Sequence, residues 1–204
     1  MLESSISAMI TGGVQLITGV RARWLGCGPA DAPRIYFANH TSHLDFVLLW
    51  SALPAQLRRR TRPVAAGDYW KEGALRRYFS GQVFRSVLVD RVCSCRSAAP
   101  TVAMLEVLDR GESLILFPEG TRGTGEDLMP FKGGIFHIAR ERPDLELVPA
   151  WMDNSYRVMP KGTILPMPLL CTVTFGSPTT IRAGEEKAAC LDRLRRQLLD
   201  LRTQ

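Results

Sequence analysis

Two short clusters of polar residues suit acid–base chemistry and anion binding. The first is the run NHTSHLD at positions 39–45, in which a histidine precedes a carboxylate by five residues. An imidazole titrates near neutral pH, so His40 is a candidate general base. Asp45 lies ~140° around an ideal helix from His40, so the two side chains meet only if His40 sits on a turn before the helix. Such a carboxylate would hold one ring nitrogen and leave the other to accept a proton.

Other interpretations of this run stay open. Ser42 followed by Asp45 also resembles a capping box at a helix N-terminus, and one carboxylate could serve both roles. A metal site built from His40, His43 and Asp45, with His137 as a further ligand, is a weaker alternative. Ser42 as a covalent nucleophile is disfavoured relative to a helix-cap serine.

The second cluster is the run FPEGTR at positions 117–122, where Pro118 and Gly120 predict an irregular loop. Arg122 offers a planar cation suited to phosphate, and Lys132 could add a second cation. The competing interpretation is a Glu119–Arg122 ion pair across a turn. A third run, VLVDR at 87–91, ends a predicted strand with Arg91, which is either a phosphate ligand or a structural terminus.

These clusters lie between alternating strand and helix patterns. We predict strands at 34–38, 63–66, 87–90, 113–117, 145–151 and 171–175, and helices at 44–53, 68–79, 98–110, 131–140 and 185–201. The alternation predicts an α/β fold with a largely parallel sheet flanked by helices. Chemistry on such a sheet belongs at the carboxyl ends of its strands, where both polar clusters lie.

The N-terminal residues show helical spacing of apolar side chains from Ile6 to Trp24. We predict an amphipathic helix that ends near Gly26, and divide the chain into a membrane-associating helix (1–28) and a catalytic domain (29–204). Core packing is the alternative for this helix, against an interfacial position with Arg21, Arg23 and Trp24 at headgroup level. The opening run from Ser4 to Val20 is too polar and too short for a membrane span, and only Glu3 precedes it where a secretory signal would have Lys or Arg.

Composition and charge narrow the possible classes. The 204 residues are 46% hydrophobic and 23% charged, which excludes extended disorder. Five cysteines without framework spacing indicate a reducing, cytosolic-facing compartment. Positions 51–96 hold ten basic and three acidic residues, so the net charge of this segment, +7, exceeds the formal net charge of the whole chain, +6. A solvated arginine-rich surface or an anionic partner would explain this concentration, and Arg58–Arg62 is a candidate membrane contact.

Together the motifs resemble those of the PlsC-like glycerolipid acyltransferases, of the 1-acylglycerol-3-phosphate acyltransferase type. NHTSHLD matches the first motif of that family and FPEGTR the third. The run VLVDR resembles the second motif and LVPA at 147–150 the fourth, so four motifs occur in order between positions 39 and 150. The chain departs from the family downstream, where Gly123 and the Lys132-Gly133 pair replace a serine and a pair of cations.

The resemblance implies a peripheral enzyme on the cytoplasmic face of the membrane. It would move a fatty acyl group from acyl-CoA or acyl carrier protein, as co-substrate and without another cofactor, to a lysophosphatidate-like hydroxyl. The residue matching the family's base is His40, oriented by Asp45. Residues implied in binding the acceptor are Arg91, Glu119, Gly120, Thr121, Arg122 and Lys132.

The missing cation keeps another lysolipid, such as a lyso-aminolipid, open as the acceptor. A non-catalytic basic module that binds lipid or nucleic acid is the alternative of a different class; the leading interpretation includes no nucleic-acid partner and no metal. The proline-rich run at 158–170 is expected either to line an acyl channel or dip into lipid, or to pack on the core.

Overall fold

The structure, a computed structural model, describes residues 2–42, 44–67, 73, 77–89, 99–125, 127–158 and 169–203. Within those residues one sheet contains seven strands. The strands are β1 (Arg21–Trp24), β2 (Arg34–Ala38), β3 (Thr61–Ala66), β4 (Val87–Val89), β5 (Ser113–Leu116), β6 (Glu146–Asp153) and β7 (Thr172–Phe175). They lie in the order β1-β7-β6-β2-β5-β3-β4, and every neighbouring pair is parallel except β6 with β7. The predicted α/β class with a largely parallel sheet is confirmed.

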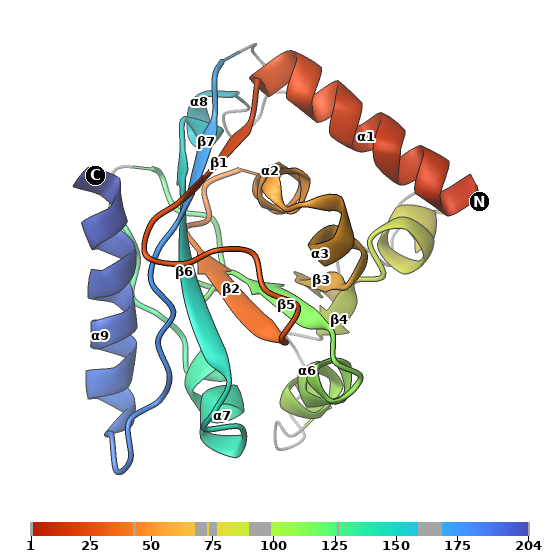
Figure 1. Ribbon diagram of the computed structural model, residues 1–204. Coiled ribbons are helices and arrows are strands. Elements are labelled where there is room, and N and C mark those ends of the chain that lie inside the picture. Colours follow the sequence, from red (N-terminus) through yellow and green to blue (C-terminus); the bar gives the residue numbers. More distant parts are fainter. Residues whose placement is uncertain are drawn as a thin grey trace.

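Helices cover both faces of the sheet (Figure 1). They are α1 (Leu2–Thr18), α2 (Asp45–Ala52), α3 (Ala55–Arg59), the π-helical turn η1 (Phe79–Val83), α6 (Ala99–Asp109), α7 (Gly134–Glu141), α8 (Ser155–Val158), α9 (Lys187–Asp200) and the short turn η2 (Leu201–Thr203). Helices α1, α2 and α3 lie on one side of the sheet, while α6, α7 and α9 lie on the other.

The central strand β2 shows how the sequence builds this arrangement. Its five residues are all buried, as expected for a strand covered on both faces. Ile35 and Phe37 pack into the core with α6, α7 and α9, whereas Tyr36 and Ala38 pack into the core with α2. Successive side chains therefore pack into the cores on opposite faces of the sheet. This packing fixes the position of β2 and of the loop that leaves its carboxyl end.

The N-terminal helix is shorter than predicted. Helix α1 ends at Thr18, and Gly19 then adopts a φ of +52°, a conformation that favours glycine. Residues 21–24 form β1, which pairs with β7, and the Trp24 ring stacks on Phe175 at 4.1 Å. The prediction of helix through Trp24 is wrong because main-chain pairing with a distant strand overrides the local apolar spacing. No described helix is both long and apolar enough to cross a bilayer.

The other elements lie close to their predicted ranges. The strand at 34–38 agrees with β2 residue for residue, and α6 and α9 begin within two residues of their predicted starts. Helix α7 begins at Gly134 instead of position 131, because the Lys132 main chain bonds back to Pro118. The short helices α3 and α8 were not predicted, and most of the predicted helix at 68–79 lies outside the described residues.

Candidate active site

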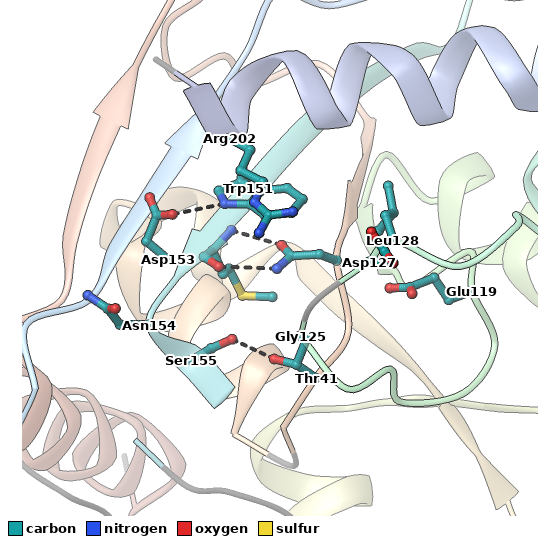
Figure 2. Close-up of a pocket in the computed structure, with 12 residues that line it drawn as sticks. Thr41, Glu119, Gly125, Asp127, Leu128, Trp151, Asp153, Asn154, Ser155 and Arg202 are labelled. Atoms are coloured by element: carbon teal, nitrogen blue, oxygen red, sulfur yellow. Dashed lines mark hydrogen bonds between the residues drawn. The ribbon is translucent and has the colours of Figure 1, made fainter. Parts of the chain in front are cut away.

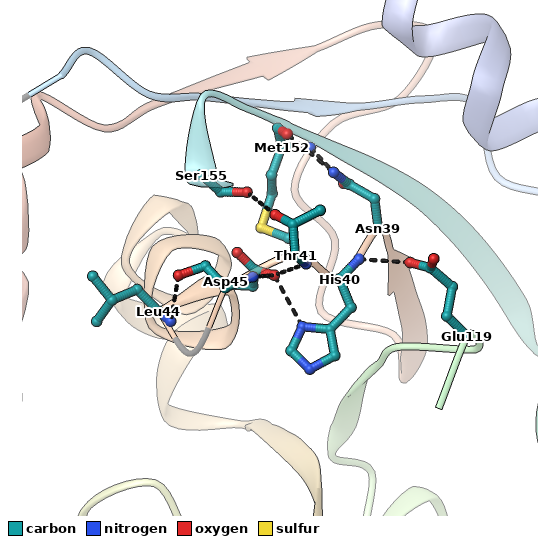
Figure 3. A network of polar contacts seen from close by, with 9 residues as sticks. Asn39, His40, Thr41, Leu44, Asp45, Glu119, Met152 and Ser155 are labelled. Carbon is teal, nitrogen blue, oxygen red and sulfur yellow. Dashed lines mark hydrogen bonds and ion pairs between the residues drawn. The ribbon is translucent and has the colours of Figure 1, made fainter. Parts of the chain in front are cut away.

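The NHTSHLD run leaves the carboxyl end of β2 and enters α2, as the sequence predicts. Asn39 anchors the start of this loop to β6. Its side-chain amide donates to the Met152 carbonyl at 3.1 Å, and its amide oxygen accepts from the Met152 N–H at 2.8 Å. The Thr41 and Ser155 hydroxyls add a second link at 2.9 Å. The loop is therefore fixed to two neighbouring elements before it reaches the helix (Figure 3).

One oxygen of Asp45 organises the loop. Its Oδ2 atom lies 2.9 Å from His40 Nδ1 and accepts the Thr41 and Ser42 main-chain N–H groups at 2.6 and 2.8 Å. Asp45 has no exposed surface. The His40–Asp45 contact that the dyad interpretation predicts is present, and the same carboxylate oxygen binds the amides before α2. The predicted N-cap at Ser42 is wrong, because the N-cap of α2 is Leu44 and no side chain bonds to the helix there. Ser42 plays its part through its oxygen, which accepts the Leu44 N–H at 3.3 Å.

The His40 ring is held at one edge and on one face. The Asp45 carboxylate can only accept, so Nδ1 carries the proton in the neutral ring and Nε2 presents a lone pair. Nε2 lies on the ring edge away from Asp45 (Figure 3). The Phe117 ring stacks on the imidazole with centroids 4.4 Å apart and planes 21° apart, and the His40 side chain is 22% exposed. A ring in this state can take a proton at Nε2 while Asp45 stabilises the resulting cation.

The FPEGTR loop holds the main chain of His40 from both sides. Glu119 Oε1 accepts the His40 N–H at 2.7 Å, and the Gly123 N–H donates to the His40 carbonyl at 2.8 Å. The second Glu119 oxygen accepts the Met129 N–H at 2.9 Å. Glu119 is buried, and this burial raises the pKa of its carboxyl against the opposing effect of the two amide bonds.

The structure places the Glu119 carboxylate on main-chain amides of the site. Acceptor binding by this residue stays a prediction, and the alternative of a surface ion pair with Arg122 is absent from the described contacts.

The other predicted acceptor ligands lie around the same loop. Gly120 has a φ of +68°, and a Cβ there would come within 2.7 Å of the Lys132 side chain. The Lys132 side chain therefore folds over Gly120, whose positive φ is a conformation that favours glycine. Thr121 and Lys132 are exposed, Arg122 is half-buried, and no described residue forms an ion pair with either cation. Arg91 lies outside the described residues.

A polar cavity of about 230 Å³ lies behind the His40 loop (Figure 2). Asn39 and Thr41 line it together with Glu119, and Trp151 and Arg202 close another side. Its remaining lining residues are Gly125, Asp127, Leu128, Met152, Asp153, Asn154 and Ser155. His40 is not among the residues that line this cavity. Most of the 158–170 run, expected near an acyl channel, lies outside the described residues.

Two other chemistries have less support in the described part of the chain. No group of three potential metal ligands among His, Cys, Asp and Glu occurs there, and His43 is not described. Cys171 is buried, and burial followed by the charges of Asp45 and Asp153 raises its pKa to about 11. Its thiol therefore stays protonated and is a poor nucleophile.

Two contributors to this site were missed by the sequence analysis. In the sequence, Phe117 ends the predicted strand at 113–117 and begins the FPEGTR motif, and Gly123 is a departure from the family pattern, but neither position indicates a contact with His40. The register that pairs Phe37 with Leu116 brings the ends of β2 and β5 together, and so places Phe117 beside the His40 loop. Only the order of strands in the sheet could have indicated this contact.

Comparison with known proteins identifies the relationship of the chain. Residues 26–153 match the sequence model of the family described as Acyltransferase. The chain is 29% identical over 175 residues to a 1-acyl-sn-glycerol-3-phosphate acyltransferase of Limnanthes douglasii, covering 83% of this chain and 58% of the relative. It is 32% identical over 135 residues to the enzyme of that name from Salmonella typhimurium, covering 62% of this chain and 51% of the relative. The chain thus spans little more than half the length of these relatives.

A solved structure shares the fold. The 1-acyl-sn-glycerophosphate (LPA) acyltransferase PlsC from Thermotoga maritima superposes with a TM-score of 0.72 at 19% identity, covering 99% of this chain and 80% of that one.

Replacing Glu119 tests its place in the interior of the site. In Glu119→Gln an amide NH₂ would replace one of two oxygens that accept main-chain N–H groups, so one buried donor would lose its partner. We expect unfolding to become easier by about 1.5 to 3 kcal/mol, and the melting temperature to fall by roughly 3 to 12 °C. Calorimetry measures this, with the exposed Glu106→Gln on α6 as the matched control. Equal melting temperatures for the two variants would contradict the assigned contacts.

Proposed function

The chain belongs to the acyltransferase family, and we propose from this membership that it transfers a fatty acyl group from a thioester to the free hydroxyl of a lysophosphatidate-like acceptor. The donor would be acyl-CoA or acyl carrier protein, and no resident cofactor would be needed because the thioester is already activated. The observation that carries the proposal is the 2.9 Å contact between His40 Nδ1 and the buried Asp45, with Nε2 directed away from it.

The reaction would need one group that removes the proton of the hydroxyl and then delivers it to the leaving thiolate. His40 Nε2 takes the proton of the acceptor hydroxyl as its oxygen attacks the thioester carbonyl. The C–S bond then breaks, and the imidazolium returns the proton to the leaving thiolate, so the products are an ester and a thiol. Asp45 stabilises the imidazolium between the two steps. The acceptor is itself the nucleophile, so no covalent acyl-enzyme is required.

The acceptor phosphate would bind beside the FPEGTR loop. Arg122 directly precedes Gly123, whose N–H contacts the His40 carbonyl, so this cation belongs to the segment that touches the base. Lys132 extends over Gly120 in the same loop. We assign the phosphate to these two side chains, with Gly120, Thr121 and Arg91 as further contributors.

The protein would work as a peripheral protein on the cytoplasmic face of a membrane. Helix α1 packs Ile6, Ile10 and Val14 toward the core, while Met9 and Leu16 are 72% and 88% exposed. Leu170, 74% exposed, lies next to Gly19 at the end of this helix. An exposed apolar surface of this kind suits insertion into a bilayer interface.

The Arg58–Arg62 cluster contributes less to that surface than its sequence suggests. Arg62 is buried, and its Nε and Nη2 groups donate to the two carboxylate oxygens of Glu112. Arg58 donates to the Ser51 and Leu53 carbonyls. The two remaining members, Arg59 and Arg60, are exposed.

Removal of the proposed base gives the most direct test. We expect His40→Ala to lower the turnover number for acyl transfer by roughly 10²- to 10⁴-fold, because proton removal from the hydroxyl loses its catalyst. Release of free thiol from acyl-CoA in the presence of lysophosphatidate measures it. His137→Ala, on α7, is the control. Full turnover by His40→Ala would refute the base assignment and favour a non-catalytic lipid-binding role.

A second test concerns the acceptor phosphate. We expect Arg122→Ala to raise the KM for lysophosphatidate roughly 10- to 100-fold, since a charge-assisted bond to phosphate is lost. Steady-state kinetics with lysophosphatidate measure this, with the exposed Arg140→Ala as control. An unchanged KM would place the phosphate elsewhere. Faster turnover of a phosphate-free lyso-aminolipid by the unmodified protein would identify that lipid as the acceptor.

The membrane proposal rests on the exposed side chains of α1. Met9→Ser combined with Leu16→Ser should reduce binding to phosphatidylglycerol vesicles more than tenfold, because each apolar side chain buried in lipid contributes about 1.5 to 3 kcal/mol. Vesicle sedimentation measures the bound fraction. Val102→Ser, 47% exposed on α6 across the sheet, should leave it unchanged. Equal loss in both variants, or no loss in either, would remove α1 as the contact.

A further inference from the structure

The face of the proposed base is covered by an aromatic ring. Phe117 follows β5 directly, and its carbonyl accepts the Gly120 N–H at 3.0 Å, which fixes the start of the loop. The ring centroids of Phe117 and His40 are 4.4 Å apart and the planes are inclined by only 21°. The imidazole thus lies nearly flat against the π-face of Phe117, in contrast to the edge-to-face geometry of most ring pairs in this core.

The two supports of the His40 ring act in different directions. Asp45 holds Nδ1 at the ring edge. This one hydrogen bond alone would still let the plane of the imidazole tilt about the line between Nδ1 and Asp45 Oδ2. The Phe117 ring blocks that motion from one face. Nε2 consequently keeps a defined direction, which proton transfer to a positioned acceptor requires.

The stack also affects the charge that develops during the reaction. The face of a benzene ring is electrically negative, so it attracts a cation placed over it far more than a neutral ring. His40 is neutral before the reaction and becomes an imidazolium once Nε2 has taken the hydroxyl proton. Its side chain is only 22% exposed, so solvent screens this attraction weakly. The stabilisation therefore arises mainly in the transition state and lowers the barrier instead of tightening ground-state binding.

We propose that Phe117 is a positioning residue of the acyl-transfer reaction, which acts through His40 by fixing the plane of the imidazole and stabilising its cationic form. The inference rests on the proposed function of His40. It goes beyond that function because it assigns a catalytic effect to an apolar side chain that need not touch either substrate.

A graded series at one position separates this electrostatic effect from simple packing. Phe117 is replaced by 4-fluoro-, 3,5-difluoro- and 3,4,5-trifluorophenylalanine, which keep the ring shape and progressively weaken its negative face. We expect the logarithm of the turnover number to fall stepwise with fluorine content while both KM values stay constant. Phe117→Leu should lose roughly 3- to 30-fold, and Phe117→Tyr should restore most of the loss.

A matched position and a spectroscopic readout complete the test. The same fluorinated residues at Phe136, which meets His137 edge-on at 5.7 Å and 72°, should leave turnover unchanged. In the NMR spectrum, the ring current of Phe117 should shift the His40 Cε1 proton upfield, and Phe117→Leu should reverse this without moving the His137 signal.

The outcomes distinguish a failure of the proposed role of Phe117 from a failure of the proposed acyl-transfer function. A flat fluorination series in an active enzyme, or a His40 signal indifferent to Phe117→Leu, would overturn the role of Phe117 alone. An unmodified protein that transfers no acyl group to any lysolipid would overturn the proposed function, whatever the NMR signal shows.

Discussion

The site depends on a single buried oxygen atom, Oδ2 of Asp45. A carboxylate with no exposed surface is costly to bury unless hydrogen-bond donors surround it, and here three N–H groups converge on this one atom. Two of the donors belong to the main chain of the turn before α2, so the turn cannot unwind without exposing or orphaning the charge. The third is the imidazole. The interaction that stabilises the loop is therefore also the one that orients the proposed base, His40.

A second constraint comes from the sheet. His40 and Glu119 are 79 residues apart, yet both follow strands that are parallel neighbours, so their loops meet at one edge. The FPEGTR loop uses this proximity through main-chain contacts, which depend little on side-chain identity, and through the buried Glu119 carboxylate, which does. Two sets of contacts therefore fix the position of His40: those with Asp45 at the start of α2, and those with the loop that follows β5.

Local patterns in the sequence predict six of the seven strands, most helices and the His40–Asp45 pair, because each depends on residues close together in the chain. They failed where distant pairing decides the outcome. The spacing of apolar residues up to Trp24 indicated helix, but β7 offers main-chain bonds and Phe175 offers a stacking surface. Arg62, expected in a surface cluster, is buried against Glu112, because a sequence shows that a residue is charged and not where the charge points. The stacking of Phe117 on His40 follows from strand register alone.

Residues in and next to the FPEGTR loop fall into two groups: some bind the His40 loop, and others have no ion-pair partner among the described residues. The Glu119 carboxylate accepts the His40 and Met129 N–H groups, and the Gly123 N–H donates to the His40 carbonyl, so these groups hold the His40 loop. Arg122 and Lys132 have no ion-pair partner among the described residues, in contrast to Arg62 with Glu112 or Arg193 with Glu185. A cation already paired would have to give up a carboxylate before it could bind phosphate, which subtracts from affinity. Cations without an ion-pair partner, next to the firmly held His40, therefore suit the proposed phosphate binding beside a proposed base.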